Sequence, residues 1–359
     1  MPRVVREYHI DLRRPADKRW SQMIRAERTR ARDLIANCLG EAKVLAERST
    51  AGKWAYRFAR KLTPLIYDLA GHGYSEDIDA WSEGTGIPRK DLIFANLSYE
   101  LSQVAGARTK NPLRFNPMGC TAAAYDLPDG GVAHVRNMDW RLTGVGTFTV
   151  VIHYAGPCGT FTTVGWPSYI GVLSGVAKGR FSATINQAPQ IGSVRPNWPP
   201  SFALRRAFES CRTFEEAVEQ LCGTKLAASV FFTLAGPEAG QAVVIEHLGS
   251  KAACRGMRAG RLAAANHYVS AELEGRNHDK LMSLDDSRLR LQCASAALEQ
   301  PAPTRLPQMV RVLGAGPTLH QFTAQRMAFV ARTGAYDVRY EDTDAAVAKW
   351  FENLKEDNS

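Results

Sequence analysis

The chain has 359 residues, 45% of them hydrophobic and 23% charged, which is typical of a globular protein with a large core and excludes a disordered chain. It contains no run of 18 apolar residues, so the sequence predicts no membrane-spanning helix. Most of the net charge of +9 lies in residues 1–119, which hold 21 Lys and Arg against 14 Asp and Glu, but no nucleic-acid-binding motif accompanies it and we expect no nucleic-acid partner.

The first part of the chain, from residue 15 to about residue 106, has helical periodicity. Apolar side chains recur there at three- and four-residue intervals, beginning with Trp20, Met23 and Ile24. Pro88 suits the first turn of a later helix, which carries Ile93 on its apolar face. We therefore expect residues 1–119 to form a helical N-terminal segment.

Residues 120–359 change to the alternating pattern of strands. Strands are predicted over 146–156, 159–166, 171–187, 228–236, 241–247 and within 325–340. Helices are predicted over 201–222 with a break near Thr213, over 283–300 with Ser283 as N-cap, and over 343–356. Strands and helices in separate blocks indicate an α+β fold with antiparallel sheets.

A β-hairpin is predicted at the start of this second part. Cys120–Asp126 forms one strand, the Pro-Asp-Gly-Gly sequence at 128–131 forms the turn, and Val132–Arg136 returns. Strand propensity does not account for Gly119-Cys120 at its head, or for Arg136 and Asp139 at its exit. Three interpretations of the cysteine fit: a buried structural thiol, a metal ligand, or a nucleophile.

The other cysteines and the preceding linker narrow this choice. The seven cysteines include no C-x-x-C pair and no close cysteine–histidine cluster, so we expect no metal, and no cofactor-binding motif is present. The N-terminus lacks the apolar segment of a secretory signal, which with the odd cysteine count predicts reduced thiols and a cytoplasmic location. Residues 106–120 are polar, contain two prolines and predict an accessible linker, which suggests processing at Gly119–Cys120.

The chain resembles a known family over nearly its whole length. The stretches that carry the resemblance are "EYHIDLRRPADKRW", "LIFANLSYEL", "CTAAAYDLPDGGVAHVRNMDW", "SYIGVLSGVAKGRFSATINQ", "TFEEAVEQLCGTKLAASVFFTLAGPEAGQAVVIEH", "AANHY" and "DDSRLR", in that order. They resemble the acid ceramidase and N-acylethanolamine acid amidase branch of the choloylglycine-hydrolase group, and are similar to the isopenicillin N acyltransferase group. These are N-terminal-nucleophile (Ntn) hydrolases, so the resemblance implies an αββα sandwich of two stacked antiparallel sheets between helical layers.

The resemblance implies that Cys120 is the nucleophile and that its free α-amino group is the base. A free α-amine titrates at about pH 8, whereas the peptide nitrogen of an uncut chain cannot accept a proton. Cleavage of the Gly119–Cys120 bond is therefore required, and it would leave 1–119 and 120–359 as associated chains. Arg136 would favour the thiolate and Asp139 would orient the amine; their ordinary alternative is a surface ion pair at the mouth of the hairpin.

Further roles follow from the same resemblance. Asn266 matches the asparagine that donates to the developing oxyanion, and Asn186 suits a second donor position. Where ceramidase-like members have a glutamate, this chain has Gln187. Arg288 resembles the second arginine of the family, although an ungapped match would place Ser287 there. We interpret His267, next to Asn266, as a packed or hydrogen-bonded histidine rather than as a partner of Cys120.

Trp166, Tyr169 and Ile170 lie near the family's acyl-chain pocket and suit a fatty acyl amide, although core packing is their ordinary alternative. The first hypothesis is a self-processing cysteine amidase acting on small N-acyl amides without a cofactor. The second is an acyltransferase that passes the acyl group to an amine, and the third is a non-catalytic binding protein that never matures.

The basic helix around residues 53–62 allows two interpretations. Lys53, Arg57, Arg60 and Lys61 share helical spacing, as do Trp54, Phe58 and Leu62. Such a helix can make weak contact with an anionic membrane surface, with cations near the phosphates. The more ordinary interpretation is that its aromatic residues pack on the catalytic domain.

Overall fold

The computed structural model describes residues 5–47, 49–71, 73–107, 118–190, 193–277 and 284–356. Its strands form two sheets. Sheet A contains, in spatial order, β1 (Arg6–Asp11), β4 (Val150–Gly156), β5 (Gly159–Gly165), β6 (Ser174–Ala177), β7 (Phe181–Gln187), β8 (Val230–Ala235), β9 (Ala242–His247) and β10 (Ala252–Gly256). Sheet B contains β11 (Arg261–Ala264), β2 (Met118–Asp126), β3 (Val132–Trp140), β12 (Thr323–Val330) and β13 (Ala335–Tyr340).

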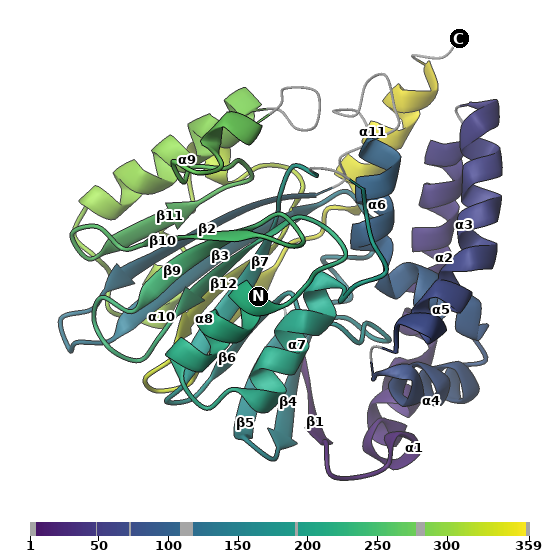
Figure 1. The fold of residues 1–359 in the computed structure, drawn as a ribbon, viewed down its shortest axis with the longest axis horizontal. Helices are drawn as coiled ribbons and strands as arrows, with labels where there is room; N and C mark the ends of the chain where they lie inside the picture. Colours follow the sequence, from purple (N-terminus) through teal and green to yellow (C-terminus); the bar gives the residue numbers. More distant parts are fainter. Residues whose placement is uncertain are drawn as a thin grey trace.

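Helices cover the outer faces of both sheets (Figure 1). On sheet A these are α7 (Pro200–Ser210) and α8 (Phe214–Gly223), and on sheet B they are α9 (Leu284–Glu299) and α10 (Leu306–Met309). Between the sheets, β2 and β3 face β7 and β8. Because each buried sheet face needs an apolar partner, these layers enclose separate cores, and the result is the αββα arrangement of the Ntn hydrolases, as expected.

The N-terminal helices pack as a group at one side of this sandwich (Figure 1). They are α1 (Ala16–Arg19), α2 (Ser21–Ala46), α3 (Thr50–Ala70), α4 (Ser75–Thr85), α5 (Arg89–Asn96) and α6 (Ser98–Ala107). A buried polar cluster ties them to α7: Asp77 accepts a hydrogen bond from Trp20 at 2.6 Å and its other oxygen lies 2.8 Å from Arg205. The remaining helix, α11 (Asp344–Glu356), is near the C-terminus, and short 3-10 turns occupy Glu274–Arg276 and Gly316–Thr318.

The secondary structure departs from the sequence prediction in several places. The predicted strand over 171–187 is two strands, β6 and β7, and the strands β10 and β11 lie outside the ranges predicted as strands. The N-terminal segment is not purely helical, because β1 joins sheet A as an edge strand parallel to β4. The stretch 106–120 is not wholly irregular, because α6 continues to Ala107 and β2 begins at Met118; the linker between them and the expected cap Ser283 lie outside the described residues. The predicted break between α7 and α8 is confirmed, since the Thr213 side chain caps α8 by accepting from the Glu216 amide at 3.1 Å.

Helix α3 does not bury its aromatic stripe. Trp54 is 66% exposed and Phe58 is 64% exposed, whereas Leu62, the third residue of the predicted stripe, is half-buried; Leu69, further along the helix, is 79% exposed. The expectation that these aromatic residues pack on the catalytic domain is therefore wrong. Within the described residues, no helix is long and apolar enough to cross a membrane.

Candidate active site

The β2–β3 hairpin brings together the residues at its two ends. Gly130, with φ of 83°, makes the tight turn at one end of the hairpin. The strands then pair in a register that sets Gly119 opposite Asp139, Cys120 opposite Met138, and Ala122 opposite Arg136. Since side chains alternate between faces, Cys120 and Arg136 share one face of sheet B, whereas Asp139 lies on the other face beside Gly119.

Arg136 contacts the Cys120 thiol directly. Its Nη2 donates to Cys120 Sγ at 3.2 Å and to the Ile185 carbonyl at 2.5 Å, while Nη1 donates to the Leu173 carbonyl at 2.9 Å and to the Ser174 hydroxyl. Arg136 is 1% exposed and Cys120 is 3% exposed. These contacts fix the guanidinium, so its charge can stabilise negative charge on the sulfur without water in between. The alternative of a surface ion pair with Asp139 does not describe Arg136.

Asn266 and Asn186 hold the backbone of Cys120. The Cys120 amide donates to Asn266 Oδ1 at 2.9 Å, and Asn266 Nδ2 donates to the Gln187 carbonyl at 2.7 Å. Asn186 Nδ2 donates to the Ala265 carbonyl at 2.9 Å and lies 3.4 Å from the Cys120 carbonyl oxygen. The structure thus brings both predicted asparagines to the nucleophile, although in the intact chain their amide groups donate to backbone carbonyls.

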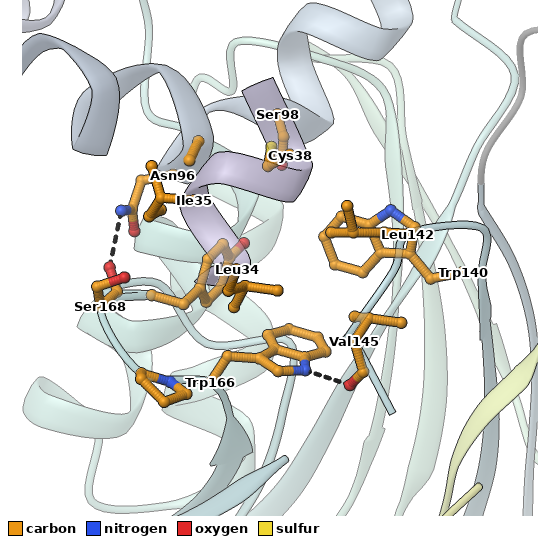
Figure 2. Close-up of a pocket in the computed structure, with 13 residues that line it drawn as sticks. Leu34, Ile35, Cys38, Asn96, Ser98, Trp140, Leu142, Val145, Trp166 and Ser168 are labelled. Carbon is orange, nitrogen blue, oxygen red and sulfur yellow. Dashed lines mark hydrogen bonds between the residues drawn. The ribbon is translucent and has the colours of Figure 1, made fainter. Parts of the chain in front are cut away.

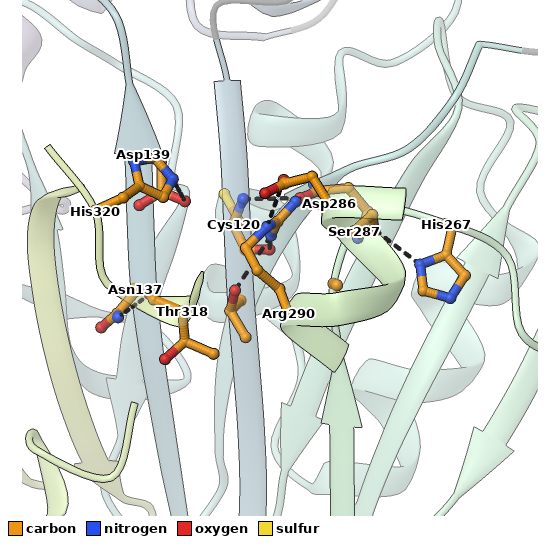
Figure 3. Close-up of polar contacts among 12 residues, drawn as sticks. Cys120, Asn137, Asp139, His267, Asp286, Ser287, Arg290, Thr318 and His320 are labelled. Atoms are coloured by element: carbon orange, nitrogen blue, oxygen red, sulfur yellow. Dashed lines mark hydrogen bonds and ion pairs between the residues drawn. The ribbon is translucent and has the colours of Figure 1, made fainter. Parts of the chain in front are cut away.

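The second arginine of the site is Arg290, not the expected Arg288. Arg290 Nη1 donates to the Cys120 carbonyl at 2.6 Å, and Nη2 donates to Asn266 Oδ1 at 2.9 Å (Figure 3). Arg290 is 2% exposed, whereas Arg288 is exposed. The reason is helical geometry, because on α9 the inward-facing residues Ser287 and Arg290 are three apart and Arg288 points elsewhere.

Ser287 connects the same helix to Asn266 and His267. Its hydroxyl accepts from the Asn266 amide at 2.8 Å and lies 2.7 Å from His267 Nδ1. Burial, together with the nearby Arg288 and Arg290, lowers the pKa of His267 to about 4, so this imidazole is neutral at pH 7. The interpretation of His267 as a hydrogen-bonded residue is confirmed.

Asp139 has partners that the sequence analysis missed. Its Oδ1 accepts from the Thr323 hydroxyl at 2.7 Å, and its Oδ2 lies 3.1 Å from His320 Nε2 (Figure 3). His320 Nδ1 accepts from the Phe322 amide at 3.3 Å, which leaves the ring proton on Nε2, next to the carboxylate. A Cβ added to Gly119 would lie 3.2 Å from Asp139 Oδ2, so the carboxylate is adjacent to the bond expected to be cut.

The predicted acyl-chain wall borders a small apolar cavity (Figure 2). Trp166 and Tyr169 line it together with Leu34 of α2 and Trp140 of β3, but Ile170 is buried in the core and is not part of its lining. Trp166 Nε1 donates to the Val145 carbonyl at 2.6 Å, which fixes the indole. The cavity volume of about 30 Å³ has room for a water molecule but not for an acyl chain.

The described residues also include no group of three or more His, Cys, Asp or Glu side chains placed to hold a metal ion. The groups that meet at Cys120 are instead a thiol, two buried guanidinium groups and two carboxamides. This is a set of groups that can activate a sulfur nucleophile and bind an anionic oxygen.

Comparisons with known proteins show what the chain is similar to. Acid ceramidase from Heterocephalus glaber is 26% identical over 265 residues, which cover 66% of this chain and 62% of that protein, and acid ceramidase from Homo sapiens is 25% identical with the same coverage. The chain thus spans less than two thirds of the length of these relatives. Among solved structures, an N-acylethanolamine-hydrolyzing acid amidase ortholog from Caenorhabditis elegans gives a TM-score of 0.49 at 21% identity, covering 59% of this chain and 93% of that one.

A second solved structure, penicillin V acylase from Agrobacterium tumefaciens, gives a TM-score of 0.43 at 14% identity, covering 62% of this chain and 83% of that one. The family of the acyl-coenzyme A:6-aminopenicillanic acid acyl-transferase matches residues 127–317, just over half of the chain. The resemblance to Ntn hydrolases drawn from the sequence is therefore confirmed, and the chain belongs to the acyl-coenzyme A:6-aminopenicillanic acid acyl-transferase family.

Proposed function

We propose that this protein is a self-processing amidase whose N-terminal cysteine, released by cleavage, hydrolyses N-acyl amides. The observation that supports it most is the contact of 3.2 Å between Arg136 Nη2 and Cys120 Sγ, next to a Gly–Cys bond. A buried thiol that only fills space needs no charged partner, whereas a nucleophile does.

Maturation would begin with attack of Cys120 Sγ on the Gly119 carbonyl carbon. The C–N bond breaks as the nitrogen takes a proton, which gives a thioester between Gly119 and Cys120 and a free α-amine. Water then hydrolyses the thioester and releases the thiol. Glycine leaves this carbonyl uncrowded, and the Asp139 carboxylate, held by Thr323 and His320, lies beside Gly119 on the face of the sheet opposite to the Cys120 thiol.

In the mature enzyme the Cys120 amine would accept the thiol proton, and the thiolate would attack the acyl carbonyl of the substrate. The amine of the substrate leaves with that proton, and water hydrolyses the acyl-cysteine. Asn266 and Asn186 would bind the oxyanion, which requires their Nδ2 groups to exchange the carbonyls of Gln187 and Ala265 for the substrate. Arg290 would keep Asn266 in place through its 2.9 Å contact with Oδ1.

Fatty acyl amides are the substrate class that we favour, because Trp166 and Tyr169 offer an apolar wall. The cavity beside them is too small for an acyl chain, so binding would require the N-terminal helices to move away from residues 166–169. Asn96 of α5 spans this junction, since it donates to the Ser168 carbonyl at 2.9 Å and accepts from the Ile170 amide at 2.6 Å.

Acyl transfer is the second candidate, and the match to an acyl-transferase family favours it specifically. The two reactions share the acyl-cysteine and differ only in whether water or an amine attacks it. Product analysis by mass spectrometry, with and without an added amine acceptor, distinguishes them. A fatty acid as the product at all amine concentrations supports the amidase, and a new amide that replaces it supports the transferase.

The first experiment is intact mass spectrometry of the purified protein, followed by assay on a series of N-acyl amides of increasing chain length. A self-processing amidase appears as two fragments that join at Gly119–Cys120, instead of one chain of 39.5 kDa. An uncut chain that hydrolyses the amides would contradict the free-amine mechanism.

We also propose that α3 makes the weak contact with anionic membranes that the sequence suggested. Its exposed stripe of Trp54, Phe58 and Leu69 is flanked by the exposed cations Lys53, Arg57 and Lys61. Such a helix can lie at a lipid surface, with the apolar stripe at the acyl boundary and the cations near phosphates. The fourth expected cation is not available, because Arg60 pairs with Asp91 of α5.

A further inference from the structure

A second, larger cavity lies between the β10–β11 turn and helix α9. Its volume is about 450 Å³, within the range of small-molecule sites. It is separate from the Cys120 site, because β11 begins at Arg261, which pairs with Tyr125 of β2. Tyr125 is five residues from Cys120 along that strand, or about 16 Å at the usual rise of a strand. The amidase chemistry proposed above does not use this cavity.

The rim of the cavity is basic. The turn that forms it carries two features that lower the stability of the folded chain. Arg258 and Arg261 pair directly across a two-residue turn, where each amide donates to the other's carbonyl, at 2.9 and 3.0 Å. Like charges at directly opposed positions destabilise a β-pair. Ala259 in this turn has φ of 48°, in the left-handed region that favours glycine. Neither exposed arginine forms an ion pair with an acidic side chain within the described part of the chain.

A third arginine, Arg255, stands behind this pair. Its Nη2 donates to the Ala263 carbonyl at 2.8 Å, while its Nε lies 3.6 Å from Glu246 Oε1 and has no hydrogen-bond partner among the described residues. Glu246 is largely satisfied elsewhere, since it accepts from the Ser270 hydroxyl at 2.8 Å and from the Val269 amide at 3.0 Å. Glu299 is the acidic side chain that also lines the cavity.

The floor of the cavity is apolar. Leu291, Ser295 and Leu298 recur at helical spacing on one face of α9, and Ala263 of β11 belongs to the same core, whereas Leu262 points into the core between the sheets. Leu298 and Ala263 are each 6% exposed, so the floor reaches into the buried layer between helix and sheet. A polar rim over such a floor matches a ligand that has one charged end and one apolar end.

We propose that this cavity binds a single-chain anionic amphiphile. Arg258 and Arg261 would bind its carboxylate or phosphate head, and the leucine floor would accept its chain. Planar guanidinium groups can bind either head with two parallel hydrogen bonds, and a bound anion removes the repulsion between the paired arginines. Fatty carboxylates and alkyl phosphates share this chemistry, so the test includes both.

The test is isothermal titration of the full chain with decanoate and with decyl phosphate, below their micellar concentrations. Decanol and inorganic phosphate are the matched half-ligands, and we expect each to bind at least tenfold more weakly than the intact amphiphile. A carboxylate that binds more tightly than the phosphate indicates a fatty acid as the source, and the reverse indicates a phosphorylated lipid. Equal affinity for decanol and decanoate would overturn the proposal.

The variant R258Q/R261Q should lose at least tenfold in affinity for decanoate, and Ser295→Trp should do the same by filling the cavity. Arg305→Gln, at another exposed arginine, is the control and should bind normally. Without ligand, R258Q/R261Q should melt at a higher temperature than the unmodified chain because the repulsion is gone, and decanoate should raise only the melting temperature of the unmodified chain. Unchanged decanoate affinity in R258Q/R261Q would place the ligand elsewhere and refute the site.

Discussion

The Cys120 site and helix α3 depart from the usual distribution of side chains in opposite directions. At the head of β2, the polar residues Arg136, Arg290 and Asn266 are almost fully buried. On α3, the apolar residues Trp54 and Phe58 are about two-thirds exposed. Buried polar groups and exposed apolar stripes are the informative exceptions in a globular fold, because neither arises from core formation.

The two exceptions differ in whether their partners are inside the protein. Arg136 donates to a thiol, two carbonyls and a hydroxyl, so its position is set before any substrate arrives. Within the described residues, Trp54 and Phe58 have no such fixed partners apart from Arg57, whose guanidinium lies 5.7 Å from the Trp54 ring. The comparison indicates preorganised chemistry in the first region and an external apolar partner for the second.

The largest effect is expected from Cys120→Ala. This variant should remain a single chain and show no amide hydrolysis, because in the proposed mechanism both maturation and turnover need the thiol. Intact mass spectrometry and a fatty acid release assay measure the two losses. Cys211→Ala removes an equally buried thiol on the far side of sheet A and is the matched control, which should still mature. Cleavage of the Cys120→Ala chain at the same bond would remove self-processing from the mechanism.

Arg290→Gln, compared with Arg288→Gln, tests which arginine of α9 belongs to the site. Arg290 holds the Cys120 carbonyl and Asn266, and removal of one partner from a buried charged contact is costly, so we expect a loss of about 10²-fold or more in kcat/KM. Arg288→Gln should stay within about twofold, since surface substitutions rarely matter. Equal losses of activity in both variants would mean that the positive charge of α9 supports the reaction, rather than the contact of Arg290 with Cys120 and Asn266.

Lipid binding tests the other side of the comparison. Changing Lys53, Arg57 and Lys61 together to Gln should weaken binding to anionic vesicles at least tenfold, because each cation near such a surface contributes about 1 kcal/mol. Arg60→Gln is the control, because its guanidinium is already paired with Asp91. Vesicle co-sedimentation at low and physiological salt measures this. If the protein binds neutral vesicles as tightly as anionic ones, the contact is made by the apolar stripe alone.

His320 offers a smaller effect. His320→Ala should lower the rate of cleavage and of hydrolysis about fivefold, the value of one partly exposed charged contact, by releasing Asp139. His320→Gln should restore most of it, because its Nε2 can donate to the carboxylate. His153→Ala breaks a histidine–carboxylate contact of the same 3.1 Å to Glu7, away from Cys120, and should change neither rate. Full activity of His320→Ala would leave Thr323 as the residue that holds Asp139.

Features that depend on residues close together in the sequence could be predicted, and features that depend on residues far apart could not. The hairpin and the α7–α8 break were predictable, because turn residues and the Thr213 cap act within a few positions of the chain. The contact between His320 and Asp139 was not predictable, because it depends on the pairing of β12 with β3, whose paired residues are 184 to 197 positions apart in the sequence. Arg288 was chosen by motif matching, whereas helical geometry selects Arg290.

The exposure of the apolar stripe of α3 could not be predicted from the local sequence pattern either. Its amphipathic spacing is the same whether the apolar stripe faces a core or a lipid surface, and only the packing of α2 and α5 against its other side decides. The strand β1 was missed for a similar reason, since six residues carry little periodicity and its pairing partner β4 lies far along the chain.

Unlike the buried polar groups at Cys120, the buried Glu100 carboxylate has no fixed partner among the described residues. Its effect on stability is the smallest that we predict. This α6 residue is 5% exposed, and neither carboxylate oxygen has a hydrogen-bond partner within the described chain. Burial raises its pKa to about 8. Between its ordinary value of about 4.3 and pH 8, the unfolded chain releases a proton that the folded chain keeps, so the stability from this group is full at low pH and is lost as the pH rises.

Glu100→Gln imitates the neutral acid at every pH and should remove this loss. We expect equal urea midpoints for the variant and the unmodified chain at pH 4.5, and a variant that is more stable by at least about 1 kcal/mol at pH 8. Glu272→Gln, at an exposed loop position, should not change the difference between the two pH values. Because both proteins contain the same histidines, the pH-dependent difference reports on Glu100 alone. A difference that does not grow with pH would show that Glu100 is ionised in the fold, with a partner that a local rearrangement supplies.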